Sequence, residues 1–196
     1  MMTKSASSAV GSVYPLFLKD LKDSYVKIKN ALERIPTGGQ IIIDVRKCTL
    51  VDPAALLELV TRLRTENSKR KGGLLKGRHI IVLGPNEGVE LLLTWILKEI
   101  HCSLIVAFPD AKSGSKWSQK VLNLQEYLSH PLKFIESREG TTARELDRHL
   151  HKGYKTPARN CLRQLFRRGL VAREGSGGSE ERPHFIYRAV KLQMLQ

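Results

Sequence analysis

The sequence predicts an α/β region followed by a smaller region of helices and a β-hairpin. Three apolar runs rich in β-branched residues, at 40–45, 79–84 and 103–108, alternate with amphipathic stretches. Strands that alternate with helices are typical of a parallel or mixed sheet covered by helices. Further along the chain, helical periodicity is followed by two short apolar runs. The fold class is therefore α/β, with a small α+β region at its C-terminal side.

The helices of the first region follow from local signals in chain order. After a short flexible start, apolar residues at steps of three and four over 14–35 predict an amphipathic helix. Asp52 is a suitable N-cap and Pro53 suits the first helical turn, so a second helix is expected over 52–64. A third amphipathic helix is expected over 87–100.

A linker separates the two regions in this interpretation. Pro, Gly, Ser and Lys cluster just after the last apolar strand, which is typical of a surface connection. We therefore expect an α/β domain over 1–110, a linker over 111–118 and a second domain over 119–196. The first helix of the second domain is expected within 119–137, where Pro131 leaves its boundaries open.

The chain is strongly basic, with 33 Lys and Arg against 19 Asp and Glu and a formal net charge of +14. Residues 111–196 carry a net +9 and residues 1–110 a net +5, although the second part is shorter. A basic region raises the expectation of a polyanionic partner, so contact with a phosphate backbone is expected in the second domain. A merely solvated basic face is the plain alternative.

Other classes of function have little support in the sequence. Cys48, Cys102 and Cys161 lack zinc or disulfide spacing, so we expect reduced thiols in a cytoplasmic protein. No run approaches the roughly 20 apolar residues of a membrane span. His149 and His151 diverge on a helix, and no nucleophile elbow, P-loop or dinucleotide motif appears. An enzyme, a metal site or a cofactor is therefore not expected.

The first region resembles a known family in the order of its elements. The strand-to-helix loop "LVD" at 50–52 and the step "VLGPNEGVELLLTW" at 82–95 are similar to those of STAS domains, the fold of bacterial anti-sigma-factor antagonists. In that family a serine in an Asp-Ser-Ser-Gly type loop is phosphorylated to switch partners. Here the loop has no such serine, and Thr49 is the nearest hydroxyl. The resemblance implies a scaffold that has lost the switch and docks a protein partner or a second copy through Asp52, Pro53 and Ala54.

The second region is similar to the helix-turn-helix of winged-helix DNA-binding proteins. Thr142 and Glu145 form a capping-box pattern, and Thr156 with Pro157 predicts the start of a second helix. Gly169 suits the end of that helix. Strands expected at 170–173 and 184–190 would form the wing, with a flexible segment between them.

Helical geometry then divides the second helix into two faces. Ala158, Cys161, Leu162 and Leu165 face inward, so the polar residues lie on the outer side. Groove and backbone contacts are expected from Lys155, Thr156, Arg159, Asn160, Arg163 and Arg167. Outer phosphate contacts are expected from Arg144, Arg148, Arg173 and Arg182.

We therefore expect a protein that binds double-stranded DNA and acts in transcription regulation or in recruiting a DNA-acting complex. The α/β domain would make protein contacts. The competing hypothesis is a protein-assembly scaffold that uses both domains without specific DNA binding. A third possibility is that the α/β domain senses a small ligand and controls the second domain.

Overall fold

The computed structural model describes residues 10–15, 26, 29–31, 33–36, 38–46, 57–62, 78–109, 117–150, 154–175 and 185–192. The strands and helices with full bounds are β1 (Val10–Pro15), β2 (Gln40–Asp44), β3 (His79–Leu83), α3 (Glu87–Glu99), β4 (Leu104–Pro109), β5 (Trp117–Leu122), α4 (Glu126–Glu136), α5 (Ala143–His149), α6 (Ala158–Arg167), β6 (Val171–Gly175) and β7 (Phe185–Ala189). Residues 57–62, within the helix expected over 52–64, are also helical.

The main sheet has five strands in the order β1-β2-β3-β4-β5. The first four strands are parallel, and β5 is antiparallel to β4. In the central pair, Gln40 lies opposite His79 and Asp44 lies opposite Leu83. The expected mixed α/β architecture is therefore confirmed, and its central strands are the runs that the sequence indicated.

The N-terminal start, expected to be flexible, contains β1, and this part of the prediction is wrong. Val10 pairs with Gln40 and Pro15 with Asp44 along the edge of β2. Proline is tolerated here because an edge strand leaves one row of N–H groups without ladder bonds. The helix expected over 14–35 therefore cannot begin at Tyr14, and its described helical residues are 26, 29–31 and 33–34. The apolar positions that predicted this helix, Leu18, Leu21, Tyr25, Ile28 and Leu32, lie outside the described residues.

Both faces of the main sheet are covered by apolar side chains. Strand side chains alternate between faces, so Ile41 and Ile43 contact one hydrophobic cluster while Ile42 contacts the other. The first cluster includes Val89, Leu93, Ile96 and Leu97 of α3. The second joins five strand residues, Ile42, Ile81, Leu83, Ile105 and Ala107, to side chains of α4, α5, α6, β6 and β7. Burial on both faces explains the uninterrupted apolar runs.

Helix α3 has clear start and stop signals. The side chain of Asn86 accepts a hydrogen bond from the Val89 N–H at the first turn, at 2.9 Å. At the other end His101 has a left-handed φ of 52°, and the Cys102 N–H donates to the Leu97 carbonyl at 2.9 Å. None of the helices in the described parts of the chain has the length and apolar character needed to span a bilayer.

Strand β5 replaces the beginning of the helix that was expected within 119–137. It pairs with β4 from Trp117 opposite Pro109 to Leu122 opposite Leu104. The exposed edge of β4 would otherwise carry unpaired backbone groups, and β5 satisfies them. Helix α4 therefore begins only at Glu126, and it continues through Pro131. The last two residues of the expected linker, 117 and 118, belong to β5, and its residues 111–116 lie outside the described residues.

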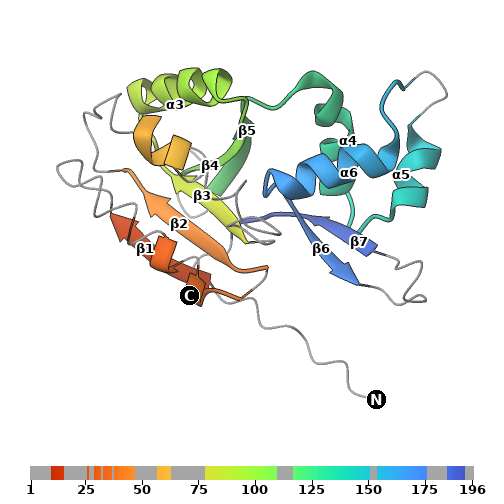
Figure 1. Cartoon of the computed structure of the whole chain (residues 1–196), viewed down its shortest axis with the longest axis horizontal. Coiled ribbons are helices and arrows are strands. Elements are labelled where there is room, and N and C mark those ends of the chain that lie inside the picture. The colour runs from red at the N-terminus through yellow and green to blue at the C-terminus, as the bar shows by residue number, and fades with distance from the viewer. Residues whose placement is uncertain are drawn as a thin grey trace, which may run out of the picture.

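The C-terminal region, defined as α4 to β7, lies beside the main sheet (Figure 1). It is held there by polar contacts as well as by the shared cluster. The Nδ1 atom of His79, in β3, lies 2.9 Å from the carbonyl oxygen of Gly169, directly after α6. The side-chain amide of Gln40, in β2, donates to the Lys191 carbonyl at 2.6 Å. These contacts join the N-terminal ends of the central strands to the C-terminal region.

His79 has a lowered pKa because it is buried, with 1% of its surface exposed. Neutral His79 donates Nδ1–H to Gly169, and its Nε2 has no hydrogen-bond partner among the described residues. The unfolded chain binds this proton near the ordinary pKa of 6.5, whereas the folded chain resists it. The contribution to stability is therefore complete above that pH and is lost as the pH falls below it.

We expect urea unfolding of the full chain to show a free energy that decreases between about pH 7.5 and pH 5.5. His79→Gln, which keeps an N–H donor but does not titrate, should show a shallower decrease. His101→Gln, at an exposed histidine, is the matched control and should retain the parent slope. An unchanged slope in His79→Gln would show that the pH dependence arises elsewhere.

Candidate nucleic-acid interface

Helix α6 has the two faces that the sequence predicted. Its inner residues Ala158, Cys161, Leu162 and Leu165 are buried, with 2% exposure or less. The pKa of the Cys161 thiol is raised by burial, so this cysteine is an unreactive core residue. The expected groove residues on the helix are all exposed, and they are Arg159, Asn160, Arg163 and Arg167.

The start of α6 differs from the prediction by one residue. Pro157, not Thr156, is the N-cap, and its carbonyl accepts from the Asn160 N–H at 2.9 Å. Because proline has no side-chain acceptor, no side chain caps the first turn. Thr156 is half-buried and its carbonyl faces the Cys161 thiol, while Lys155 is exposed just before the helix.

Helix α5 starts with the predicted capping box. The Glu145 N–H donates to the Thr142 hydroxyl oxygen, and the Thr142 N–H donates to the Glu145 carboxylate at 2.7 Å. The backbone N–H of Thr142 lowers the pKa of Glu145. Arg144 and Arg148 on this helix are exposed, as expected, and α5 packs beside α6.

The C-terminal end of α6 is fixed to the sheet region. Gly169 has a φ of 72°, and the Leu170 N–H donates to the Leu165 carbonyl, which together form a Schellman turn. The guanidinium of Arg168 donates to Ser103 Oγ and to Gln125 Oε1, both at 2.9 Å. Figure 1 shows the opposite end of α6, beside α5, lying away from the main sheet.

The β6–β7 hairpin was predicted correctly, and it contains Arg173, one of the residues expected to contact phosphate. Arg173 is exposed, and its guanidinium lies over the rings of Phe166 and Phe185, 4.5 and 4.4 Å from their centroids. This stacking holds the cation beside α6. Glu174 pairs with Arg188 across the hairpin at 3.4 Å. Arg182 and most of the expected wing lie outside the described residues.

The electrostatics of the α6 surface favour an anion. Helices α3, α4 and α5 each have a glutamate in the first turn, whereas α6 has none and carries Arg159 there. The positive end of its dipole is therefore not compensated locally. Within the described parts of the chain, no carboxylate forms an ion pair with Arg159, Arg163 or Arg167.

Hydrogen bonds of Tyr127 and Tyr154 join α6 to α4. Pro131 has no N–H, so the carbonyl four residues earlier, that of Tyr127, loses its helical donor. The hydroxyl of Tyr154 donates to this carbonyl instead. The hydroxyl of Tyr127 in turn donates to the side chain of Gln164 on α6. The proline inside α4 is therefore accommodated by contacts that also join α4 to α6.

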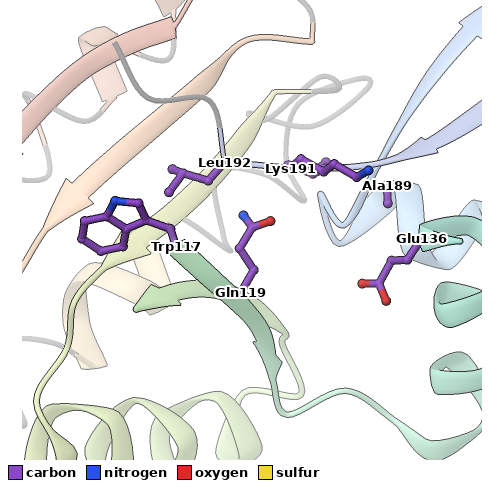
Figure 2. A pocket seen from close by; sticks show the side chains of 7 residues that line it. Trp117, Gln119, Glu136, Ala189, Lys191 and Leu192 are labelled. Atoms are coloured by element: carbon purple, nitrogen blue, oxygen red, sulfur yellow. The ribbon is translucent and has the colours of Figure 1, made fainter. Parts of the chain in front are cut away.

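A groove of about 460 Å³ lies where β5, α4 and the end of β7 meet. Figure 2 shows the indole of Trp117 and the carboxylate of Glu136 on opposite sides, with the Gln119 amide between them. Partial burial raises the pKa of Glu136, whereas Lys133 and Lys191 lower it to a smaller extent. The small ligand considered above remains a hypothesis, and this groove is one described place in which to test it.

Some functional assignments were not accessible to sequence reasoning. The sequence interpretation included Arg168 only in the net charge of residues 111–196. In the structure its guanidinium anchors α6 to Ser103 and Gln125, which lie 65 and 43 positions earlier in the chain. His149 was compared with His151, yet its Nε2 lies 3.2 Å from that of His130. The described residues contain no group of three or more potential metal ligands. The expected docking residues Asp52, Pro53 and Ala54 lie outside the described residues.

In comparisons with known proteins, no family model, no curated protein and no solved structure matched this chain. The proposed function therefore rests on the geometry of the site.

Tyr154→Phe removes the donor to the Tyr127 carbonyl, and we expect it to destabilise the fold by about 1–2 kcal/mol. In a Pro131→Ala background, residue 131 regains an N–H that can donate to the same carbonyl. The cost of Tyr154→Phe should therefore be smaller in that background. Chemical unfolding of the four variants of this double-mutant cycle measures the coupling. Equal costs in both backgrounds would contradict the assigned role of Tyr154.

Proposed function

We propose that the chain binds double-stranded DNA through α6, in the manner of a winged helix. The observation that carries this proposal is the exposed α6 face, on which Arg159, Asn160 and Arg163 occupy the first two turns without an acidic partner among the described residues. Arginine can bond guanine bidentately and asparagine can bond adenine in the major groove. Recognition helices usually present their N-terminal residues to bases.

The surroundings of α6 support the same orientation. Arg144, Arg148 and Arg173 are exposed on the neighbouring helix and hairpin, where they could contact flanking phosphates. Arg168 and His79 hold the opposite end of the helix, so the outer face is presented by a fixed element. A fixed helix loses less conformational entropy on binding.

We further propose that the α/β region, whose sequence resembles STAS domains in the expected order of elements, makes protein contacts while α6 holds DNA. The role would be transcription regulation or recruitment of a DNA-acting complex. The buried, free thiol of Cys161 is in keeping with a reducing, cytoplasmic location.

The test is binding of the full chain to mixed-sequence duplex DNA at several salt concentrations. The full chain is used because the C-terminal region shares a hydrophobic cluster with the sheet. Binding should weaken steeply with salt, with a logarithmic slope of about 0.9 for each phosphate contact. An Arg159→Ala/Arg163→Ala double variant should bind at least about tenfold more weakly, since each good base contact is worth about 1–3 kcal/mol.

The matched control is Arg34→Ala, which removes an exposed arginine next to Ile35 of the cluster that contains α3. It should bind like the parent, and all variants should have the same thermal unfolding midpoint. Parent-like binding by the double variant would show that the recognition face is wrong. No binding by the parent at low salt would favour the scaffold alternative.

A further inference from the structure

Helix α3 has a nonpolar stripe on its solvent-facing side. Leu91 is 65% exposed and Trp95 is 53% exposed, and they lie one turn apart. The inner face of the same helix is fully occupied by Val89, Leu93, Ile96 and Leu97. Tryptophan is among the residues that most often carry the binding energy of protein interfaces. A solvent-exposed Leu–Trp pair therefore marks a surface for a partner.

Charges of opposite sign stand at the two ends of this stripe. Glu87 lies one turn before Leu91, and Lys98 lies about one turn after Trp95. At about 100° per residue, all four side chains point to the same side of the helix. Both charged residues are exposed, and neither forms an ion pair within the described parts of the chain. The nearby Glu90 is different, because it pairs with Lys120 at 2.6 Å.

We propose that the partner at this surface is a second copy of the same chain, with the two α3 helices packed antiparallel. A twofold axis at the level of residue 93 would place Leu91 of each copy against Trp95 of the other. Glu87 lies about 9 Å from this level along the helix axis, and Lys98 about 7.5 Å on the other side. The same axis therefore brings each Glu87 near the Lys98 of the other copy. The stripe is self-complementary in the order of its apolar and charged residues, as a twofold interface requires.

The remaining geometry is compatible with this pairing. Gly88 is exposed beside the stripe and has no side chain that could separate the helices. Figure 1 shows α3 at the edge of the molecule, with α6 on a different part of the surface, so both surfaces can be occupied together. One helix from each copy is smaller than a standard interface, and the dimer should therefore be reversible.

This inference rests on the proposed role of the α/β region in protein contacts and names the partner. It requires no DNA binding, and the oligomeric state is measured without nucleic acid. Failure of the dimer and failure of DNA binding would therefore be separate results.

The experiment is sedimentation velocity on the full chain over a wide concentration range at low salt. The parent should shift from monomer to dimer as concentration rises. Leu91→Lys should remain monomeric, whereas Val26→Lys, at the 50% exposed Val26 outside the stripe, should dimerise like the parent. All variants should retain the circular dichroism spectrum of the parent.

Charge reversal tests the antiparallel geometry. Glu87→Lys and Lys98→Glu alone should each weaken the dimer about tenfold, because each places like charges together at two symmetric positions. The double variant Glu87→Lys/Lys98→Glu should recover an affinity within about threefold of the parent. A parent that stays monomeric up to about 1 mM would overturn the proposal. A dimer that is insensitive to Leu91→Lys, or single reversals that the double variant does not rescue, would overturn it as well.

Discussion

The position of α6 depends on one peptide group, the carbonyl of Gly169, and on the buried histidine that binds it. Gly169 ends α6 at a φ that few residues other than glycine adopt, and this turns its carbonyl toward His79 at the start of β3. Arg168 adds contacts to Ser103 and Gln125 from the same turn. These contacts fix the C-terminal end of the helix, while its buried inner face and the Tyr127–Gln164 hydrogen bond fix its rotation. Together they set the direction in which the exposed arginines point.

The main sheet to which α6 is anchored is buried on both faces. Neighbouring residues of one strand, such as Ile41 and Ile42, contact different hydrophobic clusters. One cluster contains α3, and the other contains the inner faces of α4, α5 and α6. The two proposed binding surfaces therefore lie outside opposite layers around the same strands.

The sequence predicted the elements whose signals are local. The apolar runs of β2, β3 and β4, the capping box at Thr142 and the inner face of α6 appear as expected, because each depends on a few neighbouring residues. Strands β1 and β5 were missed because an edge strand is specified largely by the backbone of its neighbour, β2 or β4, which lies elsewhere in the chain. For the same reason composition indicated a basic helix but not which of its arginines would be anchored. Arg168 and Arg167 are adjacent, yet only the tertiary contacts of Arg168 distinguish them.

The first turn of α6 carries a charge that the helix dipole disfavours. An arginine in the first turn opposes the helix dipole, at a typical cost of about 0.3–1 kcal/mol. Pro157 provides no side-chain cap to offset that cost, whereas α5, the preceding helix, has a full capping box. The fold therefore tolerates a locally unfavourable start at α6, which is the one helix with full bounds in the described chain that contains no acidic residue. Buried Leu162 and Leu165, together with the anchor at Gly169, supply the stability that this start lacks. Local rules are most often broken in this way where a surface has to receive a ligand, and an anion is the ligand that would relieve the cost.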